Sequence, residues 1–273
     1  MIETHVQQER FPVDVHLAEP DATDGVYVLA RCARLEGDLF DALCQTLCPL
    51  THCFANLMMP VREYPRLVKA SLPEDSGVVP LLDNLLVTAD RMEQLNASCV
   101  ALCHGANGAA VRYNVADLMG DMLAEFAEPF AMAPGVKIQR QLESVMVVAP
   151  YGPIYNSAKE LCLNAVAAMP MGGQLSVAAG PLDVWAGDDW NVLGIAEGRY
   201  ARITIGDSGA GVAPQCRASL WDPFVTGPES RGFGLGLSFV YRSLAEIKGF
   251  CMYRATGAPG AEFMIWVPAV SDD

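Results

Sequence analysis

Apolar residues recur every three or four positions in two long segments of the N-terminal half of the chain. This spacing places each set on one face of an α-helix. The first set is Leu35, Leu39, Leu43, Leu47, Leu50, Phe54 and Leu57, and the second is Leu82, Leu85, Ala89, Met92, Leu95, Cys99 and Leu102. The pattern predicts a helix from about Val28 to Met59, kinked or opened at Pro49, and a second helix that ends at Gly105.

Two consecutive helices with one apolar stripe each predict a helical hairpin over residues 25–108. A single hairpin leaves much of its apolar stripe exposed, so we expect two copies of the chain to associate as a homodimeric four-helix bundle. Residues 1–24 mix prolines and acidic residues with isolated apolar ones, which predicts an extended tail before the hairpin.

The pattern changes after a glycine-rich linker at residues 105–114, where helical and strand-like segments follow one another without strict alternation. Helices are expected over residues 115–130, 154–169 and 237–248, and strands over residues 136–148, 175–178, 201–205 and 262–267. This order predicts an α+β fold, in which residues 112–270 form an α/β two-layer sandwich.

Composition and charge exclude several classes of protein. The 273 residues are 52% hydrophobic and 18% charged, which indicates a globular protein. The net charge of −14 repels nucleic-acid phosphates and anionic lipids, so no nucleic-acid partner is expected. No apolar run reaches the roughly 20 residues of a membrane span. The polar N-terminus does not resemble a secretory signal, so a cytoplasmic protein without a membrane partner is expected.

Glu160 and Asn164 are the first residues that suggest chemistry. They lie four positions apart in a predicted helix and therefore project from one face. A carboxylate and an amide in this arrangement could hold a hydrated Mg²⁺, a cation that prefers oxygen ligands and keeps several waters. A solvated helix face explains the pair equally well.

Asp207 ends a predicted strand and is followed by Gly209 and Gly211. Residues without a side chain let a planar ring approach the backbone closely. The carboxylate of Asp207 could then accept a hydrogen bond from an exocyclic amine such as adenine N6. A plain tight turn is the competing interpretation.

Two further segments follow towards the C-terminus. Residues 220–227 (LWDPFVTG) predict an aromatic anchor for a mobile segment, with Phe224 and Thr226 as the candidate contacts. Glycines then alternate with other residues at Gly232, Gly234 and Gly236, and Leu237 directly follows as the first residue of the last predicted helix. A glycine-rich turn that leads into a helix N-terminus favours anion binding. By itself this turn could serve a dinucleotide or no ligand at all.

In this order and spacing, the four segments resemble the ATP-binding domain of sensor histidine kinases. The wider superfamily includes gyrase B, a family of heat-shock chaperones and MutL. ELCLNA (160–165) is similar to the N box, DSGAGV (207–212) to the first glycine box, WDPFVTG (221–227) to the F box and GFGLGL (232–237) to the second glycine box. The resemblance covers residues 112–268 and is specific as an ordered set.

The resemblance implies that the ligand is Mg-ATP. Asn164 would coordinate Mg²⁺ between the phosphates, Glu160 would orient or deprotonate the attacking group, and Asp207 would bind adenine. The other implied contacts are Gly209, Gly211, Phe224, Thr226, Arg231, Gly232, Gly234, Gly236 and Leu237. Family members with a similarly short lid, here residues 212–231, often carry a Lys after the F-box Thr. In this chain Arg231 would supply that positive charge.

The same resemblance makes the hairpin the dimerisation and phosphoacceptor domain. The family motif is often H-E-x-x-N-P-L-T, and this chain reads Cys44-Gln45-Thr46-Leu47-Cys48-Pro49-Leu50-Thr51. Cys44 therefore stands at the acceptor position without the imidazole nitrogen that phosphoramidate chemistry needs, and Gln45 cannot act as an acid or base. His52, predicted on the solvent side of the helix, is a substitute acceptor, and His104 at the end of the second helix is another.

Three functions remain open. The leading one is a histidine-kinase-type signal transduction protein that binds Mg-ATP and takes part in two-component phosphoryl transfer, with a response regulator or a partner kinase as its partner. The second is a non-catalytic dimeric adaptor or phosphotransfer-like protein that docks a response regulator, which the intact nucleotide motifs disfavour. The third is an anti-sigma-type protein serine kinase, a class that usually lacks a long hairpin.

Overall fold

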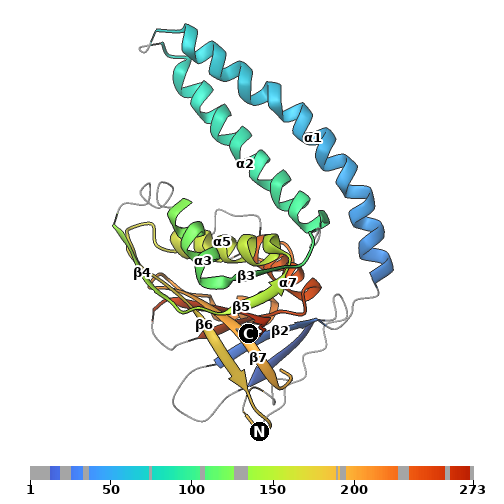
Figure 1. Ribbon diagram of the computed structural model, residues 1–273. Helices are drawn as coiled ribbons and strands as arrows, with labels where there is room; N and C mark the ends of the chain where they lie inside the picture. Colours follow the sequence, from blue (N-terminus) through green and yellow to red (C-terminus); the bar gives the residue numbers. More distant parts are fainter. Residues whose placement is uncertain are drawn as a thin grey trace. The chain divides into compact units, whose positions relative to one another are not determined.

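The computed structural model describes residues 13–18, 26–32, 37–73, 76–104, 108–125, 135–188, 190, 195–226, 234–255 and 259–270. The chain divides into two compact units (Figure 1). Residues 36–104 form one unit, which is a helical hairpin. Residues 1–35 and 105–273 together form the other, which contains the strands.

The hairpin unit consists of α1 (Gly37–Ser71) and α2 (Val79–His104), which lie side by side. Among the side chains described in this unit, the buried ones are Thr51, Pro65 and Ala89. Pro49 does not end α1, because a proline removes only one hydrogen bond of the helical ladder and the rest of that ladder continues.

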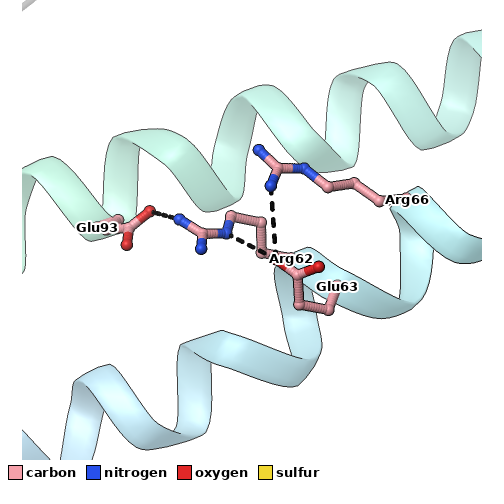
Figure 2. Close-up of polar contacts among 4 residues, drawn as sticks. All are labelled: Arg62, Glu63, Arg66 and Glu93. Atoms are coloured by element: carbon pink, nitrogen blue, oxygen red, sulfur yellow. Dashed lines mark hydrogen bonds and ion pairs between the residues drawn. The ribbon is translucent and has the colours of Figure 1, made fainter.

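Ion pairs join the two helices of the hairpin. Figure 2 shows Arg62 of α1 reaching Glu93 of α2, and the Arg62 Nε atom lies 3.2 Å from Oε1 of Glu63. Lys69 of α1 pairs with Asp83 of α2 in the same way. Exposed ion pairs contribute about 0–1 kcal/mol each, so these contacts favour one register of the helices rather than supply most of the stability.

Seven strands form the main sheet in the order β1-β2-β8-β9-β7-β6-β4. Their bounds are β1 Val13–Ala18, β2 Val26–Cys32, β4 Val136–Leu142, β6 Gly173–Val184, β7 Gly198–Asp207, β8 Phe250–Ala255 and β9 Ala261–Pro268. All neighbours are antiparallel except β4 and β6. A smaller sheet pairs β3 (Val111–Asn114) with β5 (Met146–Ala149).

One face of the main sheet carries α3 (Val115–Glu125), α5 (Tyr151–Ala167) and α7 (Gly236–Glu246) (Figure 1). Alternate residues of the central strands, such as Ile203 and Ile265, are buried in the same core as Leu161 and Leu244 of the helices. This confirms the predicted two-layer α/β sandwich. None of the described helices combines the length and the apolarity needed to cross a membrane.

The other face of the sheet buries a second apolar cluster. Trp266 of β9 is fully buried there, and the ring of Trp190 meets it edge-on at 4.7 Å between centroids. The remaining buried members are Val184, Ile195, Tyr200, Met252 and Met264. The connection between β6 and β7 supplies Trp190 and Ile195, so part of the second face is also shielded from water.

The predicted domain bounds are wrong at the N-terminus. β1 and β2 lie in the stretch expected to be a tail and the start of a helix, and β2 pairs with β8 from Val26–Ala255 to Ala30–Cys251. Edge strands present unpaired N–H and C=O groups, and an added strand satisfies them. The hairpin therefore begins near residue 36 and is flanked on both sides by strands of one sheet-containing unit.

Smaller differences concern the linker and the helix ends. The expected linker contains the strand β3, and the expected strand 136–148 is two strands, β4 and β5. The helix expected from residue 115 is described as far as Glu125, and residues 126–130 lie outside the described part. β8 was not predicted, because Phe250–Ala255 is apolar on both faces and shows no alternation.

Candidate functional site

Glu160 and Asn164 lie on α5 and are half-buried at its edge. The opposite side of the helix is held against the sheet by buried residues such as Ile154 and Leu161. The Glu160 carboxylate lies directly against the first residue of α7, because a Cβ built on Gly236 would stand 2.1 Å from Glu160 Oε1. Burial raises the pKa of Glu160, and the nearby Lys159 partly offsets this effect.

Asp207 is the last residue of β7, and its turn is built around glycines. The Gly209 N–H donates to Asp207 Oδ1 at 2.8 Å. Burial raises the pKa of Asp207, whereas hydrogen bonds from the backbone of Gly209 and Ala261 act in the opposite direction. Gly211 has φ of +71° and faces the carbonyl of Gly260, so a residue with a side chain would be both strained and obstructed.

The Asp207 turn contacts the C-terminal end of α5. A Cβ on Gly209 would stand 2.4 Å from the carbonyl oxygen of Ala168, the residue that follows α5. Ala168 comes one helical turn after Asn164, which comes one turn after Glu160. The helix α5 therefore brings three of the predicted motifs together: Glu160 beside α7, Asn164 in the middle and the Asp207 turn at its end.

The aromatic segment and the glycine-rich segment are joined by their backbones. The Phe224 N–H donates to the Gly234 carbonyl at 2.8 Å, and a Cβ on Gly234 would stand 2.5 Å from the Val225 carbonyl oxygen. Trp221 anchors this end in the core, edge-on to Phe263 at 6.1 Å. The Phe224 ring is 73% exposed and its φ is +67°, an uncommon value for a residue with a side chain.

The first turn of α7 presents backbone N–H groups. Leu235 is its N-cap residue and makes no side-chain capping bond, while Ser238 Oγ donates to the Leu235 carbonyl at 2.8 Å. Leu237 is half-buried in this turn. A helix N-terminus without a side-chain cap keeps donors and a positive partial charge available for an anion.

Some predicted residues lie outside this arrangement. Thr226 is exposed beside Phe224, and Arg231 and Gly232 lie outside the described residues. Cys44 and His52 belong to α1 and His104 to α2, and their side chains are not among those described. The structure therefore brings the described residues of the four motifs into one unit, and it does not test the acceptor positions.

Sequence patterns did not indicate two residues that shape the site. Ser208 Oγ accepts the Gln174 N–H at 2.9 Å and so ties the start of β6 to the Asp207 turn. Gly260 has φ of +120°, and a Cβ there would stand 2.1 Å from the Asp207 carbonyl oxygen. A glycine before a strand hints at close backbone approach, but the partner is distant in sequence.

Most of the helix-and-strand part that follows the hairpin matches a known protein family. Residues 153–271 match the family described as histidine kinase-, DNA gyrase B-, and HSP90-like ATPase. The chain carries a histidine kinase-type ATP-binding core. It is 24% identical over 229 residues to the sensor kinase CckA of Brucella abortus, which covers 82% of this chain and 24% of that protein. It is also 31% identical over 111 residues to the sensor histidine kinase ZraS of Salmonella typhimurium, covering 41% and 21% of the two chains.

A solved structure shares the fold. The full-length ShkA, determined in complex with AMPPNP, superposes with a TM-score of 0.64 and 21% identity, and the match covers 83% of this chain and 46% of that one. At this identity the likeness concerns the fold alone. The chain spans about a quarter of the length of the curated relatives it matches.

The raised pKa of Glu160 predicts how the ATP-binding core responds to pH. A carboxyl group whose pKa is raised on folding destabilises the native state above its unfolded pKa, and the penalty disappears once the group is protonated in both states. Glu160→Gln should therefore raise the free energy of unfolding of the ligand-free protein at pH 8, and the gain should shrink towards pH 4. Denaturant titrations at several pH values test this.

The matched control is Glu197→Gln, which alters an exposed carboxylate between β6 and β7. It should leave the pH profile of the wild type unchanged. A Glu160→Gln profile that runs parallel to that of the wild type from pH 4 to pH 8 would contradict the prediction.

Proposed function

We propose that this chain binds Mg-ATP between α5, the Asp207 turn and the first turn of α7, and that it takes part in two-component phosphoryl transfer. One observation carries the proposal. The single helix α5 touches the start of α7 through Glu160 and the Asp207 turn through Ala168, with Asn164 between these two contacts. The adenine amine needs a hydrogen-bond acceptor, which the Asp207 carboxylate offers, and the phosphates need N–H donors, which the uncapped start of α7 offers.

Asp207 is the proposed adenine contact. Its carboxylate accepts backbone hydrogen bonds from Gly209 and Ala261, and because two carboxylate oxygens offer about four acceptor sites it can accept the adenine amine as well. The absence of side chains at Gly209 and Gly211 would let the ring lie close to the backbone. Phe224 and Thr226, which belong to the proposed lid of residues 212–231, would also contact the nucleotide.

The proposed phosphate contacts are the backbone of Gly232, Gly234, Gly236 and Leu237, with Arg231 as the nearby cation. The uncapped start of α7 supports this assignment, since its N–H groups and its dipole favour negative charge. A nucleotide phosphate would supply the acceptors that the first turn of α7 does not receive from a side-chain cap.

Asn164 is the proposed Mg²⁺ ligand. It is half-buried on α5, and its side chain forms no hydrogen bond within the described part of the chain, so the amide oxygen is available to a cation. One protein oxygen, phosphate oxygens and waters are the ligand set that Mg²⁺ commonly takes in phosphoryl-transfer sites. When bound, the cation would neutralise charge on the phosphates. The described residues contain no cluster of three or more His, Cys, Asp or Glu that could hold a metal without a nucleotide.

Glu160 is the proposed group that orients or deprotonates the acceptor. Its carboxylate lies beside the first turn of α7, where the phosphates are placed, and its raised pKa makes it a better proton acceptor near neutral pH. The acceptor itself is proposed to lie on a partner, because Cys44 occupies the position at which the family carries its histidine. A response regulator or a partner kinase would be that partner.

The hairpin is proposed to form a homodimer. Thr51, Phe54 and Met58 of α1 are buried or half-buried in the single hairpin, and a second apolar stripe lies roughly 90° around the helix from them. Its members are Leu50, Leu57, Val61, Tyr64 and Val68. A matching set on the second helix consists of Leu81, Leu85 and Met92 of α2 and Val78 directly before it, and all of these side chains are exposed in the single hairpin. Two apolar stripes on each helix are what a four-helix bundle requires.

Incubation with γ-labelled ATP tests the proposed function. We expect measurable ATP binding, no acid-labile label on the chain alone, and acid-labile label on Cys44→His, which restores an imidazole at the acceptor position. Acid-labile label on the wild type that disappears in His52→Ala would show a relocated acceptor and overturn the assignment to a partner. Absence of ATP binding would overturn the nucleotide site itself.

A non-catalytic adaptor is the second candidate, favoured by Cys44 and Gln45 at the family's acceptor positions. It predicts that ATP binds but that no label reaches Cys44→His or a separately supplied receiver domain. Binding of that receiver domain to the hairpin would then be the activity to measure.

A further inference from the structure

Gly236 and Gly234 exclude a side chain for different physical reasons. Gly234 has φ of +69° and a Cβ there would meet backbone atoms, with the Phe224 carbonyl carbon at 2.7 Å. Gly236 is the first residue of α7 and its φ is not in the left-handed region. A Cβ on Gly236 would instead meet one side chain, at 2.1 Å from Oε1, 2.8 Å from Cδ and 3.0 Å from Cγ of Glu160.

The two helices that carry this contact cannot easily move apart. α5 is fixed by buried residues such as Leu161 and Ala165, and α7 by Val240 and Leu244. A methyl group at position 236 would therefore be accommodated by the flexible end of Glu160 rather than by the backbone. The carboxylate would have to rotate away from the start of α7.

We propose that Gly236 is a positioning residue that seats the Glu160 carboxylate against the first turn of α7. The position of the carboxylate against Gly236 follows from the contact distances, and its consequence for phosphoryl transfer rests on the proposed function. A nucleotide phosphate bound at the same turn brings negative charge beside Glu160 and raises the pKa of the carboxyl further, which suits a proton acceptor. Gly236 thus acts on the reaction through Glu160, besides leaving its own backbone open to phosphate.

A double-mutant cycle in the ligand-free protein tests the contact between Gly236 and the Glu160 carboxylate. Gly236→Ala is combined with Glu160→Ala, and the unfolding free energies of the four proteins are compared. We expect Gly236→Ala to be destabilising when Glu160 is present and neutral or stabilising when it is absent. An equal effect in both backgrounds would overturn the proposal. Gly120→Ala in α3 is the control, since a Cβ there meets nothing within 4 Å.

A spectroscopic measurement distinguishes a specific contact between Gly236 and Glu160 from a general effect of the substitution on packing. The pKa of Glu160, followed by carbon NMR of the carboxyl group, should fall towards its ordinary value in Gly236→Ala because the displaced carboxylate gains solvent. In Gly120→Ala it should stay as in the wild type. An unchanged Glu160 pKa in Gly236→Ala would overturn the proposal.

Activity measurements then distinguish this inference from the proposed function. In Gly236→Ala, ATP affinity should change by less than tenfold while phosphoryl transfer falls on the order of 10²-fold, as expected for a misplaced reacting group. Glu160→Asp, one methylene shorter, should restore part of that loss in the Gly236→Ala background. A wild type that transfers no phosphoryl group to a supplied receiver domain or partner kinase overturns the proposed function, whereas the unfolding cycle and the Glu160 pKa still decide whether Gly236 positions Glu160.

Discussion

Asp207→Asn should weaken ATP binding by about 10- to 100-fold, because a hydrogen bond to a charged acceptor is worth about 1.5–3 kcal/mol and each 1.4 kcal/mol is a factor of ten. The amide oxygen of the new residue can keep the bond from the Gly209 N–H. Its NH₂ group then faces the adenine amine, so one donor meets another. Isothermal titration of the purified protein with Mg-ATP measures the change.

The fold should survive this substitution. Burial raises the pKa of Asp207, so the ionised carboxylate costs stability near neutral pH and a neutral amide removes that cost. The matched control is Asp183→Asn, which alters an exposed carboxylate on β6. An Asp207→Asn protein that binds ATP as tightly as the control would rule out the proposed adenine contact.

The double substitution Leu57→Glu and Tyr64→Glu should convert the proposed homodimer into monomers. Both side chains are about two-thirds exposed in the single hairpin, at 70% and 66%, so the hairpin itself should remain folded. In a two-fold dimer each substitution acts twice. At about 1.5 kcal/mol or more for each buried apolar side chain, the dimer dissociation constant should rise on the order of 10⁴-fold.

Analytical ultracentrifugation over a concentration series measures this change. Met59→Glu is the control, because Met59 is 59% exposed but lies about 200° around α1 from Leu57. It should remain dimeric. A wild type that is monomeric at all concentrations, or a double variant that stays dimeric, would exclude the hairpin stripe as the interface.

Local sequence patterns predicted much of this protein because their causes are local. A helix repeats every 3.6 residues, so the stripes of the hairpin and the shared face of Glu160 and Asn164 follow from spacing alone. Turn chemistry is also local, and the glycines around Asp207 form a turn in which backbone atoms of other segments lie close, whereas the approach of a planar ring stays a prediction. The ordered motifs therefore indicated the ATP-binding core before any contact was known.

Pairing between distant segments could not be predicted in this way. Nothing in the periodicity of β2 shows that it pairs with β8, more than 200 residues later, and β8 itself lacks the alternation that marks a strand with one buried face. Strand partners are selected by the edges and the core that other segments leave open. This is why the N-terminal residues were expected as a tail.

Sequence by itself indicated a helical hairpin with its apolar stripes, because helical spacing is local, and the ordered motifs that resemble an ATP-binding domain, because each motif is a short run of neighbouring residues. Tertiary structure alone decided that Glu160 rests on Gly236 and that Ala168 rests on Gly209. Those contacts depend on where whole helices pack against the sheet, because buried apolar side chains such as Leu161 and Leu244 set the helix positions. The glycine-rich segment is therefore both a motif in the sequence and, through Gly236, the contact surface for the carboxylate of Glu160, which lies 76 positions before Gly236.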